Sequence, residues 1–467
     1  MSTLRIFNHY VRVPFLVLGL IEIIGIFSSV VLGSYLLVRY HFSEEGYYLE
    51  LSLKAGIMTL VMLLSMIAAG LYQARLREGT LGFILRLTTS YLLGILGLSL
   101  IFYIFPDLLL GRGIMAISLA SSFAFILVIR WFLFLTDPNL FKKRILVLGA
   151  GKRASVITEL RRKSDQFGFT ILGFVHLRGE TDVVEKEKIL NLNMPLIDYV
   201  DRNDVDEIVM AIEDRRKGIP MRELLDCKMH GVDIIDVLTF FERETGKIRL
   251  DQLQPSWLLF SQGFNQGGMR DFSKRAFDIV ISAGLLLLTW PFMLLAAIAI
   301  WLESGCKFDT PIFFKQVRVG LGGRPFQVLK FRSMVVNAEK SGKAQWATKN
   351  DSRVTRVGKL IRKIRVDELP QIFNVFRGDM SFVGPRPERP EFVVMLSEKI
   401  PYYAERHHVK PGITGWAQLL YPYGSSEKDA MEKLQYDLYY VKNHSIFLDF
   451  LIMLQTAEVV LFGRGAR

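Results

Sequence analysis

Long apolar runs, separated by short polar segments, dominate the first 136 residues of the chain. There are four such runs, and each reaches the ~20 residues that a helix needs to cross the hydrocarbon core of a bilayer. The pattern therefore predicts a four-helix transmembrane domain over residues 1–140. The runs cover residues 14–38, 51–73, 83–105 and 114–135.

Basic residues are unevenly distributed among the segments that connect these runs. One set of segments is rich in Lys and Arg, whereas acidic residues dilute the basic ones in the other set. Because basic loops remain in the cytoplasm, we expect the N-terminus and everything after residue 140 to be cytoplasmic. The first set contains Arg5, Arg12, Arg75, Arg77, Lys142, Lys143 and Arg144; the second contains Arg39, Lys54 and Arg112 with Glu44, Glu45, Glu50 and Asp107.

The first apolar run contains one carboxylate, Glu22, about a third of the way along. Such a group is either a functional acid or a carboxylate that pairs with another helix or reaches the interface. Its position favours the second interpretation. The runs carry no other pattern of buried charges, which argues against a transporter.

Between residues 141 and 262 the long runs give way to short apolar strands that alternate with helical segments. This alternation is typical of a parallel sheet with right-handed helical crossovers. We therefore predict a Rossmann-like, CoA- or nucleotide-binding-like cytoplasmic domain. Its strand candidates are residues 144–149, 169–175, 207–212 and 232–237, and its first helix is expected at residues 154–163.

The first of these strands ends in a glycine-rich turn, GAGKRA, that fits the pattern G-x-G-x-x-A. In such a turn Gly149 and Gly151 let a pyrophosphate approach the N-terminus of the next helix. The acidic residue that would hold a ribose is missing, because the second strand ends in GFVH at residues 173–176. The sequence favours a turn kept for packing or regulation, with a bound nucleotide as the alternative.

A fifth apolar run, residues 279–302, is long enough to span the bilayer but contains Pro291 at its centre. Proline breaks helical hydrogen bonding at such a position. Basic residues flank the run at both ends, so we expect a re-entrant helix that enters from the cytoplasm, turns at Pro291 and returns. The alternative is a kinked span that would export residues 303–467. The flanking basic residues are Lys274 and Arg275 before the run and Lys307, Lys315 and Arg318 after it.

Composition narrows the class of protein. Of the 467 residues, 51% are hydrophobic, which rules out a mainly disordered chain. The net charge of +12 suits a nucleic-acid binder, but the apolar content favours a membrane protein. The only cysteines, Cys227 and Cys306, exclude a disulfide-based fold, and no cleavage site for a signal peptide follows the first run.

The C-terminal region is predicted to combine a β-hairpin with a basic amphipathic helix. The hairpin strands cover residues 312–320 and 324–331. In the helix, apolar residues occupy one face and basic residues the others, which suits lipid phosphates or a substrate pyrophosphate. The apolar face comprises Leu360, Ile361 and Ile364; the basic residues are Lys359, Arg362, Lys363 and Arg365.

Two adjacent carboxylates, Asp367 and Glu368, follow this helix directly. Beside so many cations they suit a site in which Mg²⁺ neutralises phosphate charge and one carboxylate remains free to attack. An aspartate can form a covalent phospho-intermediate, which divides one difficult displacement into two. Further on, Arg386 lies between two prolines, so its guanidinium is held with little entropy to lose, as bidentate phosphate recognition requires.

These segments, in this order, resemble the bacterial sugar transferases, the polyprenol-phosphate phosphoglycosyl transferases with a monotopic catalytic domain. The four-span head and the Rossmann-like middle are similar to the long form of this family. The resemblance implies a catalytic domain of α+β type at residues 263–467, which contains the re-entrant helix. The family often has Ser before the proline of that helix, where this chain has Thr289-Trp290. The matching segments are residues 274–278 (KRAFD), 316–320 (QVRVG), 330–334 (KFRSM), 362–371 (RKIRVDELPQ), 378–388 (GDMSFVGPRPE), 411–418 (PGITGWAQ) and 436–440 (YDLYY).

The resemblance also implies a reaction. A sugar-1-phosphate, for which we expect a hexose, passes from a UDP-sugar to undecaprenyl phosphate with release of UMP, and this step initiates exopolysaccharide, O-antigen or capsule assembly. Asp367 would be the nucleophile and the Mg²⁺ ligand, with Glu368 as its partner near metal and phosphate. The residues implied to bind the substrate phosphates are Lys330, Arg332, Arg362 and Arg386.

By the same resemblance the partners are the UDP-sugar, undecaprenyl phosphate, the lipid bilayer and downstream glycosyltransferases, with no nucleic acid and with homodimerisation left open. The protein is expected to be a multi-pass protein of the bacterial cytoplasmic (inner) membrane, with its catalytic domain on the cytoplasmic face. The alternative is a non-catalytic scaffold or regulator of polysaccharide export, against which the intact Asp367-Glu368 pair argues. A nucleotide-sugar dehydratase or epimerase is disfavoured, because no Tyr has a Lys four residues later.

Overall fold

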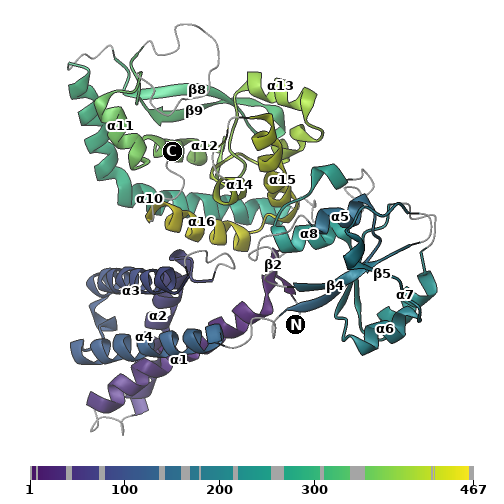
Figure 1. Ribbon diagram of the computed structural model, residues 1–467. Coiled ribbons are helices and arrows are strands. Elements are labelled where there is room, and N and C mark those ends of the chain that lie inside the picture. Colours follow the sequence, from purple (N-terminus) through teal and green to yellow (C-terminus); the bar gives the residue numbers. More distant parts are fainter. Residues whose placement is uncertain are drawn as a thin grey trace. The chain divides into compact units, whose positions relative to one another are not determined.

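The computed structural model describes residues 3–6, 9–37, 45–72, 79–135, 142–158, 169–177, 180–213, 219–253, 268–305, 310–336, 353–421, 424 and 426–461. The chain divides into two compact units. One covers residues 10–245 with the first six residues, and the other covers residues 246–467 with residues 7–9. The first unit contains apolar helices and a parallel sheet (Figure 1), and the second contains the Asp367-Glu368 pair.

Four apolar helices follow two short strands, β1 (Thr3–Ile6) and β2 (His9–Arg12). Each helix overlaps one predicted run and is long and apolar enough to cross a bilayer. Their shared core contains Met58, Met62 and Met66, while many large apolar side chains remain exposed, as lipid-facing positions are. The helices are α1 (Val13–Leu37), α2 (Glu45–Ala68), α3 (Gly79–Ile104) and α4 (Arg112–Leu135).

Glu22 is fully buried between these helices and forms an ion pair with Arg130 of α4. Arg130 Nε lies 2.6 Å from one carboxylate oxygen and Nη2 lies 3.0 Å from the other. Arg130 Nη1 donates to the carbonyl oxygen of Leu71 at 2.7 Å, and the Tyr72 hydroxyl donates to Glu22. The interhelical interpretation of Glu22 is thus confirmed.

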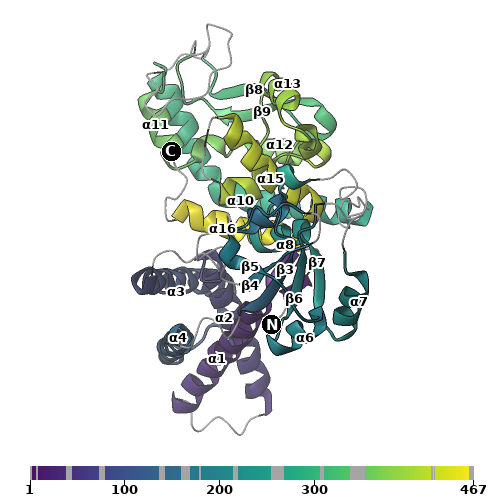
Figure 2. The ribbon, with the colours of Figure 1, turned by 45° about the vertical axis from the view of Figure 1, so that its right-hand side comes forward.

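The middle of the chain forms a five-stranded parallel sheet with the order β5-β4-β3-β6-β7. Helices α5 and α8 cover one face of the sheet, and α6 and α7 cover the other (Figure 1; Figure 2 shows α6, α7 and α8 from another side). The predicted parallel sheet with helical crossovers is therefore confirmed, although the last five residues of the predicted first helix lie outside the described residues. The strands are β3 (Lys143–Leu148), β4 (Phe169–Val175), β5 (Ile189–Leu190), β6 (Glu207–Met210) and β7 (Asp233–Asp236); the helices are α5 (Lys152–Thr158), α6 (Leu196–Arg202), α7 (Met221–Met229) and α8 (Val237–Thr245).

The space beside the glycine-rich turn after β3 is occupied by a side chain of the same domain, Glu213. Gly149 has a φ of +110°, a conformation that favours glycine. Glu213 Oε1 accepts a hydrogen bond of 2.6 Å from the backbone N–H of Lys152, and a Cβ added to Gly151 would lie 2.7 Å from the same oxygen. A carboxylate thus lies where a pyrophosphate would approach the helix. This supports the interpretation as a packing turn, and nucleotide binding at Gly149 and Gly151 stays a prediction.

The second unit is built on α10 (Gly268–Glu303), a helix that contains the fifth apolar run and continues through Pro291. Its ribbon changes direction between its two halves in Figure 1. The predicted hairpin is present as the antiparallel strands β8 (Phe313–Val319) and β9 (Pro325–Phe331), and β10 (Ser381–Val383) pairs in parallel with β11 (Gly412–Thr414). The other helices are α11 (Arg356–Lys363), α12 (Gln371–Arg377), α13 (Pro390–Lys399), α14 (Trp416–Leu420), α15 (Glu427–Asn443) and α16 (Ile446–Leu461).

The first turns of α10 are bound to this unit by charged groups. Lys274 Nζ lies 2.7 Å from Asp449 Oδ2, and the Asp449 side chain is fully buried. One turn later, Asp278 Oδ1 accepts hydrogen bonds of 2.9 Å from the Ser381 hydroxyl and from the Phe382 N–H. The KRAFD segment thus fastens α10 to β10 and α16.

The last turns of α10 are bound to the same unit. Ile300 packs in an apolar cluster with Phe331 of β9, and Ser304 accepts a hydrogen bond from Arg332. Between the two bound ends lies a stretch of exposed apolar side chains, which suits contact with lipid. This stretch includes Leu287, Leu288, Phe292, Leu294 and Leu295.

Candidate active site

The backbone turns sharply just before the two carboxylates. α11 is capped by Thr355, whose side chain accepts a hydrogen bond of 2.9 Å from the Gly358 N–H. After α11, Arg365 adopts a φ of +60°, a conformation that is costly for a residue with a side chain and that clusters at functional sites. The 3₁₀ turn Val366–Glu368 follows and turns Asp367 into the unit.

Helix α10 packs against this turn. Val366 and Leu369, which flank the carboxylate pair, pack with Met293, Ala296 and Ile300 of α10. The pair is therefore held between an apolar base and the cations of the hairpin and of the segment around Arg386.

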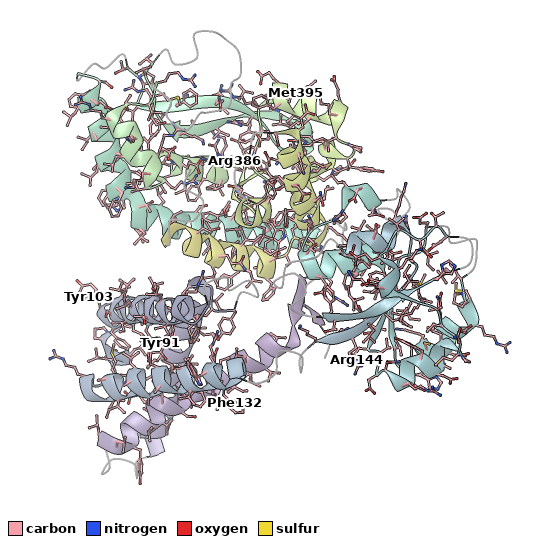
Figure 3. The ribbon with its side chains drawn as sticks, viewed as in Figure 1. Tyr91, Tyr103, Phe132, Arg144, Arg386 and Met395 are labelled. Atoms are coloured by element: carbon pink, nitrogen blue, oxygen red, sulfur yellow. The ribbon has the colours of Figure 1, made fainter. Side chains whose placement is uncertain are left out.

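Glu368 lies between two cations. Its Oε1 is 2.9 Å from Lys330 Nζ and 3.4 Å from Arg386 Nη2 (Arg386 is labelled in Figure 3). Burial alone would raise the pKa of Glu368, but Lys330 and Arg386 overcome this effect and hold the pKa well below its usual range. Burial also lowers the pKa of Lys330, although the charge of Glu368 opposes that shift. Glu368 is thus an ionised carboxylate already engaged by two cations, and it is poorly placed to attack.

Asp367 differs from its neighbour in having no partner among the described residues. Its relative exposure is 9%, and in the part of the chain that the structure describes no hydrogen-bond donor or ion-pair partner meets its carboxylate. Burial and the charge of Glu368 raise the pKa of Asp367 to about 6, against the opposing charges of Lys330, Arg362 and Arg365. An ionised, unpartnered carboxylate of this kind is suited to act as a nucleophile or as a metal ligand.

Arg332 and Arg362, the remaining predicted phosphate ligands, form no hydrogen bond or ion pair with this pair among the described residues. Arg332 Nη2 donates to Ser304, while the buried Nη1 has no hydrogen-bond partner among the described residues. A buried donor without a partner is available to an anionic substrate. Arg362 acts on Asp367 through its charge. Of the other predicted positions, Pro291 lies within α10, and Gly149 and Gly151 belong to the first unit.

The turn that carries Arg386 is packed backbone against backbone. A Cβ added to Gly412 would lie 2.0 Å from the Gly384 nitrogen, and a Cβ added to Gly415 would lie 2.2 Å from the Gly384 oxygen. No side chain fits at such distances, which explains why glycine recurs in the segments GPRP and PGITG. These contacts join the turn to the β10–β11 pair.

Two residues near Arg386 were missed from the sequence. Gln418 of α14 accepts a hydrogen bond of 3.4 Å from Arg386 Nη1, and Arg406 donates one of 2.9 Å to the Arg386 carbonyl. Gln418 ends the matching segment 411–418, which was a usable signal. Arg406 lies outside every matching segment, so no sequence signal pointed to it.

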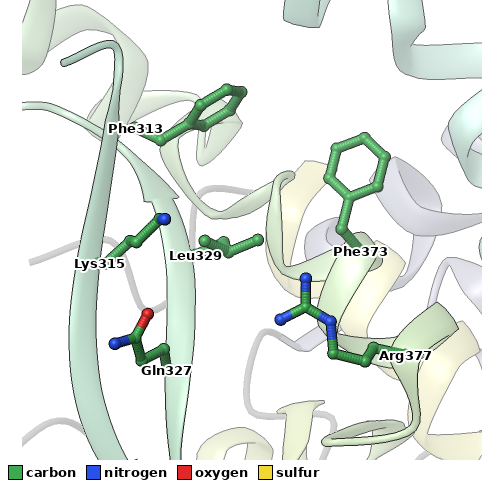
Figure 4. Close-up of a pocket in the computed structure, with 6 residues that line it drawn as sticks. All are labelled: Phe313, Lys315, Gln327, Leu329, Phe373 and Arg377. Atoms are coloured by element: carbon green, nitrogen blue, oxygen red, sulfur yellow. The ribbon is translucent and has the colours of Figure 1, made fainter.

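A pocket of about 350 Å³ lies between the hairpin and α12 (Figure 4). It presents two cations, two aromatic rings, an amide and a leucine. None of the predicted site residues is among those that line it. The lining residues are Phe313, Lys315, Gln327, Leu329, Phe373 and Arg377.

A metal site made only of protein ligands is not present among the described residues, because no group of three His, Cys, Asp or Glu side chains comes together there. Mg²⁺, however, is commonly bound by one or two carboxylates together with substrate phosphates and water. The unpartnered carboxylate of Asp367 fits such a shared site, and Glu368, held by Lys330 and Arg386, fits it less well.

Comparison with protein families gives two matches. A family described as "Bacterial sugar transferase" matches residues 269–463, and one described as "CoA-binding domain" matches residues 67–235. The first match contains the hairpin, the Asp367-Glu368 pair and the Arg386 turn. The second contains the parallel sheet and the two apolar helices before it.

Curated relatives match over longer stretches. The chain is 43% identical over 246 residues to the UDP-N-acetylgalactosamine-undecaprenyl-phosphate N-acetylgalactosaminephosphotransferase of Aeromonas hydrophila, which covers 53% of this chain and 56% of that protein. It is 34% identical over 333 residues to the UDP-glucose:undecaprenyl-phosphate glucose-1-phosphate transferase of Xanthomonas campestris pv. campestris, which covers 69% of this chain and 68% of that protein. It is 36% identical over 334 residues to the protein of the same name from Klebsiella pneumoniae, which covers 70% of this chain and 69% of that protein. The matches thus span 56% to 69% of these relatives' lengths. This chain belongs to the bacterial sugar transferase family.

Proposed function

We propose that this protein transfers a sugar-1-phosphate from a UDP-sugar to undecaprenyl phosphate and releases UMP, as the first membrane step of polysaccharide assembly. The names of the three relatives support the two substrates, since each names a UDP-sugar and undecaprenyl phosphate. The observation in this chain that carries the proposal is the buried, unpartnered carboxylate of Asp367 beside a Glu368 held by Lys330 and Arg386. A scaffold would have no use for such an arrangement.

In the first step an Asp367 carboxylate oxygen attacks the phosphorus that carries the sugar. The bond from this phosphorus to the oxygen that bridges the two phosphates breaks, and UMP leaves with the electron pair. The sugar phosphate stays on Asp367 as an acyl phosphate. Glu368 is not the nucleophile, because Lys330 and Arg386 stabilise its charge.

In the second step an oxygen of undecaprenyl phosphate attacks the same phosphorus. The bond to Asp367 breaks, which restores the carboxylate and leaves the sugar on undecaprenyl diphosphate. Lys330 and Arg386 contact Glu368, and Arg362 acts on Asp367 through its charge. Together with Arg332 they would stabilise charge on the phosphoryl oxygens. We propose Mg²⁺ at Asp367 as the cofactor, which when bound neutralises phosphate charge.

We propose further that α10 enters the membrane and returns to the side from which it came. Asp278 and Ile300 both contact the same folded unit. In a straight helix these residues would be ~33 Å apart at a rise of 1.5 Å per residue, which is about the thickness of the hydrocarbon core. A helix that crossed the bilayer would place one of the two contacts on the far side, away from the domain.

The same contacts support a catalytic domain that lies on one side of the bilayer. UDP-sugars are cytoplasmic, so that side is the cytoplasmic face of the bacterial inner membrane. Leu360 and Ile364 of the basic segment remain exposed at 60% and 55%, while Ile361 is buried. An exposed surface that is both apolar and basic suits the membrane interface.

We propose a hexose-1-phosphate as the transferred group, because the Xanthomonas and Klebsiella relatives are named for glucose-1-phosphate. The name of the Aeromonas relative makes N-acetylgalactosamine the competing sugar.

The test is nucleotide release by the purified full chain. It is given Mg²⁺, undecaprenyl phosphate and, in turn, UDP-glucose, UDP-galactose and UDP-N-acetylgalactosamine. We expect UMP with one donor and none from Asp367→Asn. Glu405→Gln is the matched control, because Glu405 is an exposed carboxylate of the same unit. UDP in place of UMP would refute the mechanism, and release of neither nucleotide would favour the scaffold or regulator.

A further inference from the structure

The turn that carries Arg386 is held through its main chain by groups outside the turn. Pro385 and Pro387 have no N–H, so these two residues cannot donate a main-chain hydrogen bond within the turn. Instead, four successive carbonyl oxygens each accept a hydrogen bond from elsewhere in the unit. The donors are Gly412 N to Pro385 at 2.9 Å, Arg406 Nη2 to Arg386 at 2.9 Å, Arg318 Nη1 to Pro387 at 3.2 Å and Val319 N to Glu388 at 2.9 Å.

Two of these donors are arginine side chains that other residues hold in place. Arg406 is buried, and its Nη1 donates to the Tyr403 hydroxyl at 2.7 Å while Nη2 lies 2.8 Å from Asp437 Oδ2. Arg318 of β8 donates from Nη2 and Nε to Gln316 at 2.6 and 3.1 Å. Each guanidinium is thus oriented on one side and presents an N–H to the turn on the other.

Geometry explains why arginine serves here. A guanidinium is planar and donates in several fixed directions at once, so it can bind an orienting group and a carbonyl together. A lysine ammonium keeps the charge but cannot donate in these fixed, coplanar directions. Burying a charged guanidinium is costly unless it is paired and hydrogen-bonded. Arg406 makes these contacts through Nη1 and Nη2, which bind Tyr403, Asp437 and the Arg386 carbonyl, whereas its buried Nε has no hydrogen-bond partner among the described residues.

We infer that Arg406 and Arg318 are positioning residues that fix Arg386 against Glu368 by holding the backbone of its turn. The inference rests on the proposed function, in which Arg386 binds substrate phosphate. Arg406 donates to the main chain at residue 386 and Arg318 at residue 387, and Arg318 Nη1 also lies 3.6 Å from Glu388 Oε2.

A double-mutant cycle tests this coupling in the full-length protein. Arg406→Lys and Arg318→Lys should each lower kcat/KM for the UDP-sugar by about 10- to 100-fold, the effect of a displacement of about 1 Å. In an Arg386→Ala background the same changes should alter kcat/KM by less than about twofold. If the single effects multiply instead, the two arginines act independently of Arg386 and the inference fails.

Arg243→Lys is the matched control for loss of a buried guanidinium. Arg243 pairs with Glu207 at 2.7 Å in the first unit and should leave kcat/KM unchanged when replaced. If Arg406→Lys does not fold, as shown by its melting temperature, Arg318→Lys carries the test, because its side chain is partly exposed.

Hydrogen exchange provides a measurement that does not depend on activity. The Gly412 and Val319 N–H groups donate into the turn, so their exchange should accelerate in Arg406→Lys and stay at the wild-type rate in Arg243→Lys. Unchanged exchange in Arg406→Lys would overturn the inference even if the enzyme is active. Failure of the wild type to release UMP would count against the proposed function alone, because accelerated exchange would still show that these side chains seat the turn.

Discussion

Replacing Glu22 with Leu should destabilise the protein far more than replacing Glu22 and Arg130 together. In the wild type, Arg130 Nε and Nη2 bind both oxygens of Glu22, and neither side chain is exposed to solvent by more than 5%. The single change leaves a buried guanidinium without its counter-ion.

The magnitude follows from what remains in each variant. Removing one partner of a buried pair costs about 3–5 kcal/mol, whereas replacing both with apolar residues is often close to neutral. The double variant Glu22→Leu/Arg130→Met still loses the hydrogen bond to the Leu71 carbonyl, which is worth about 1 kcal/mol. We therefore expect the double variant to be more stable than Glu22→Leu by about 2–4 kcal/mol.

The free energy of unfolding can be measured in detergent micelles by titration with a denaturing surfactant, followed by tryptophan fluorescence. Lys54→Met is the control, because Lys54 pairs with a Glu50 whose side chain is 62% exposed, and it should cost less than about 0.5 kcal/mol. A double variant less stable than Glu22→Leu would show that the two charges do not depend on each other, and the reasoning would be refuted.

Three further predictions concern pH, topology and metal. Arg243 and Lys143 hold the pKa of Glu207 below its usual value, although burial alone would raise it. The stability that this pairing contributes is present above the pKa of an unfolded glutamate and is lost as pH falls through the lower pKa of the folded state. The difference in melting temperature between wild type and Glu207→Gln should therefore shrink on acidification. A difference that grows on acidification would contradict this. In a Cys227→Ser background, a cysteine placed at the exposed Phe272 and the natural Cys306 should both react with an impermeant maleimide from the cytoplasmic side of membrane vesicles; reaction from opposite sides would mean that α10 crosses. Excess chelator should stop UMP release and added Mg²⁺ should restore it, and full activity in chelator would remove the metal from the mechanism.

Much of the architecture could be predicted because it depends on local pattern. Apolar runs, alternating strands and helices, and a glycine-joined hairpin each repeat within a few residues, and the structure contains all of them. Asp367 and Glu368 were also identifiable, because the two carboxylates and the cations of α11 are adjacent in sequence.

What could not be predicted depends on contacts between distant segments. The partner of Glu22 lies 108 residues away, and nothing in the local spacing of either residue indicates the other. The two carboxylates differ in their environment because Lys330 and Arg386, which are 38 and 18 residues away in sequence, both contact Glu368. The glycine pattern at residue 149 is satisfied by Glu213, a residue of a different loop, so the motif alone does not reveal what fills the turn.

The packing of Val366 and Leu369 on α10 has a consequence for how this enzyme would meet its lipid substrate. These two residues flank the Asp367-Glu368 pair, and they pack on the same helix that, in the proposed topology, enters the bilayer. In that topology Asp367 would lie at the membrane surface, close to the phosphate of a membrane-bound lipid. The lipid acceptor would then react without leaving the membrane. If α10 is the membrane anchor, a protein truncated to remove it would also lose the apolar residues on which Val366 and Leu369 pack, so anchoring and activity would be lost together.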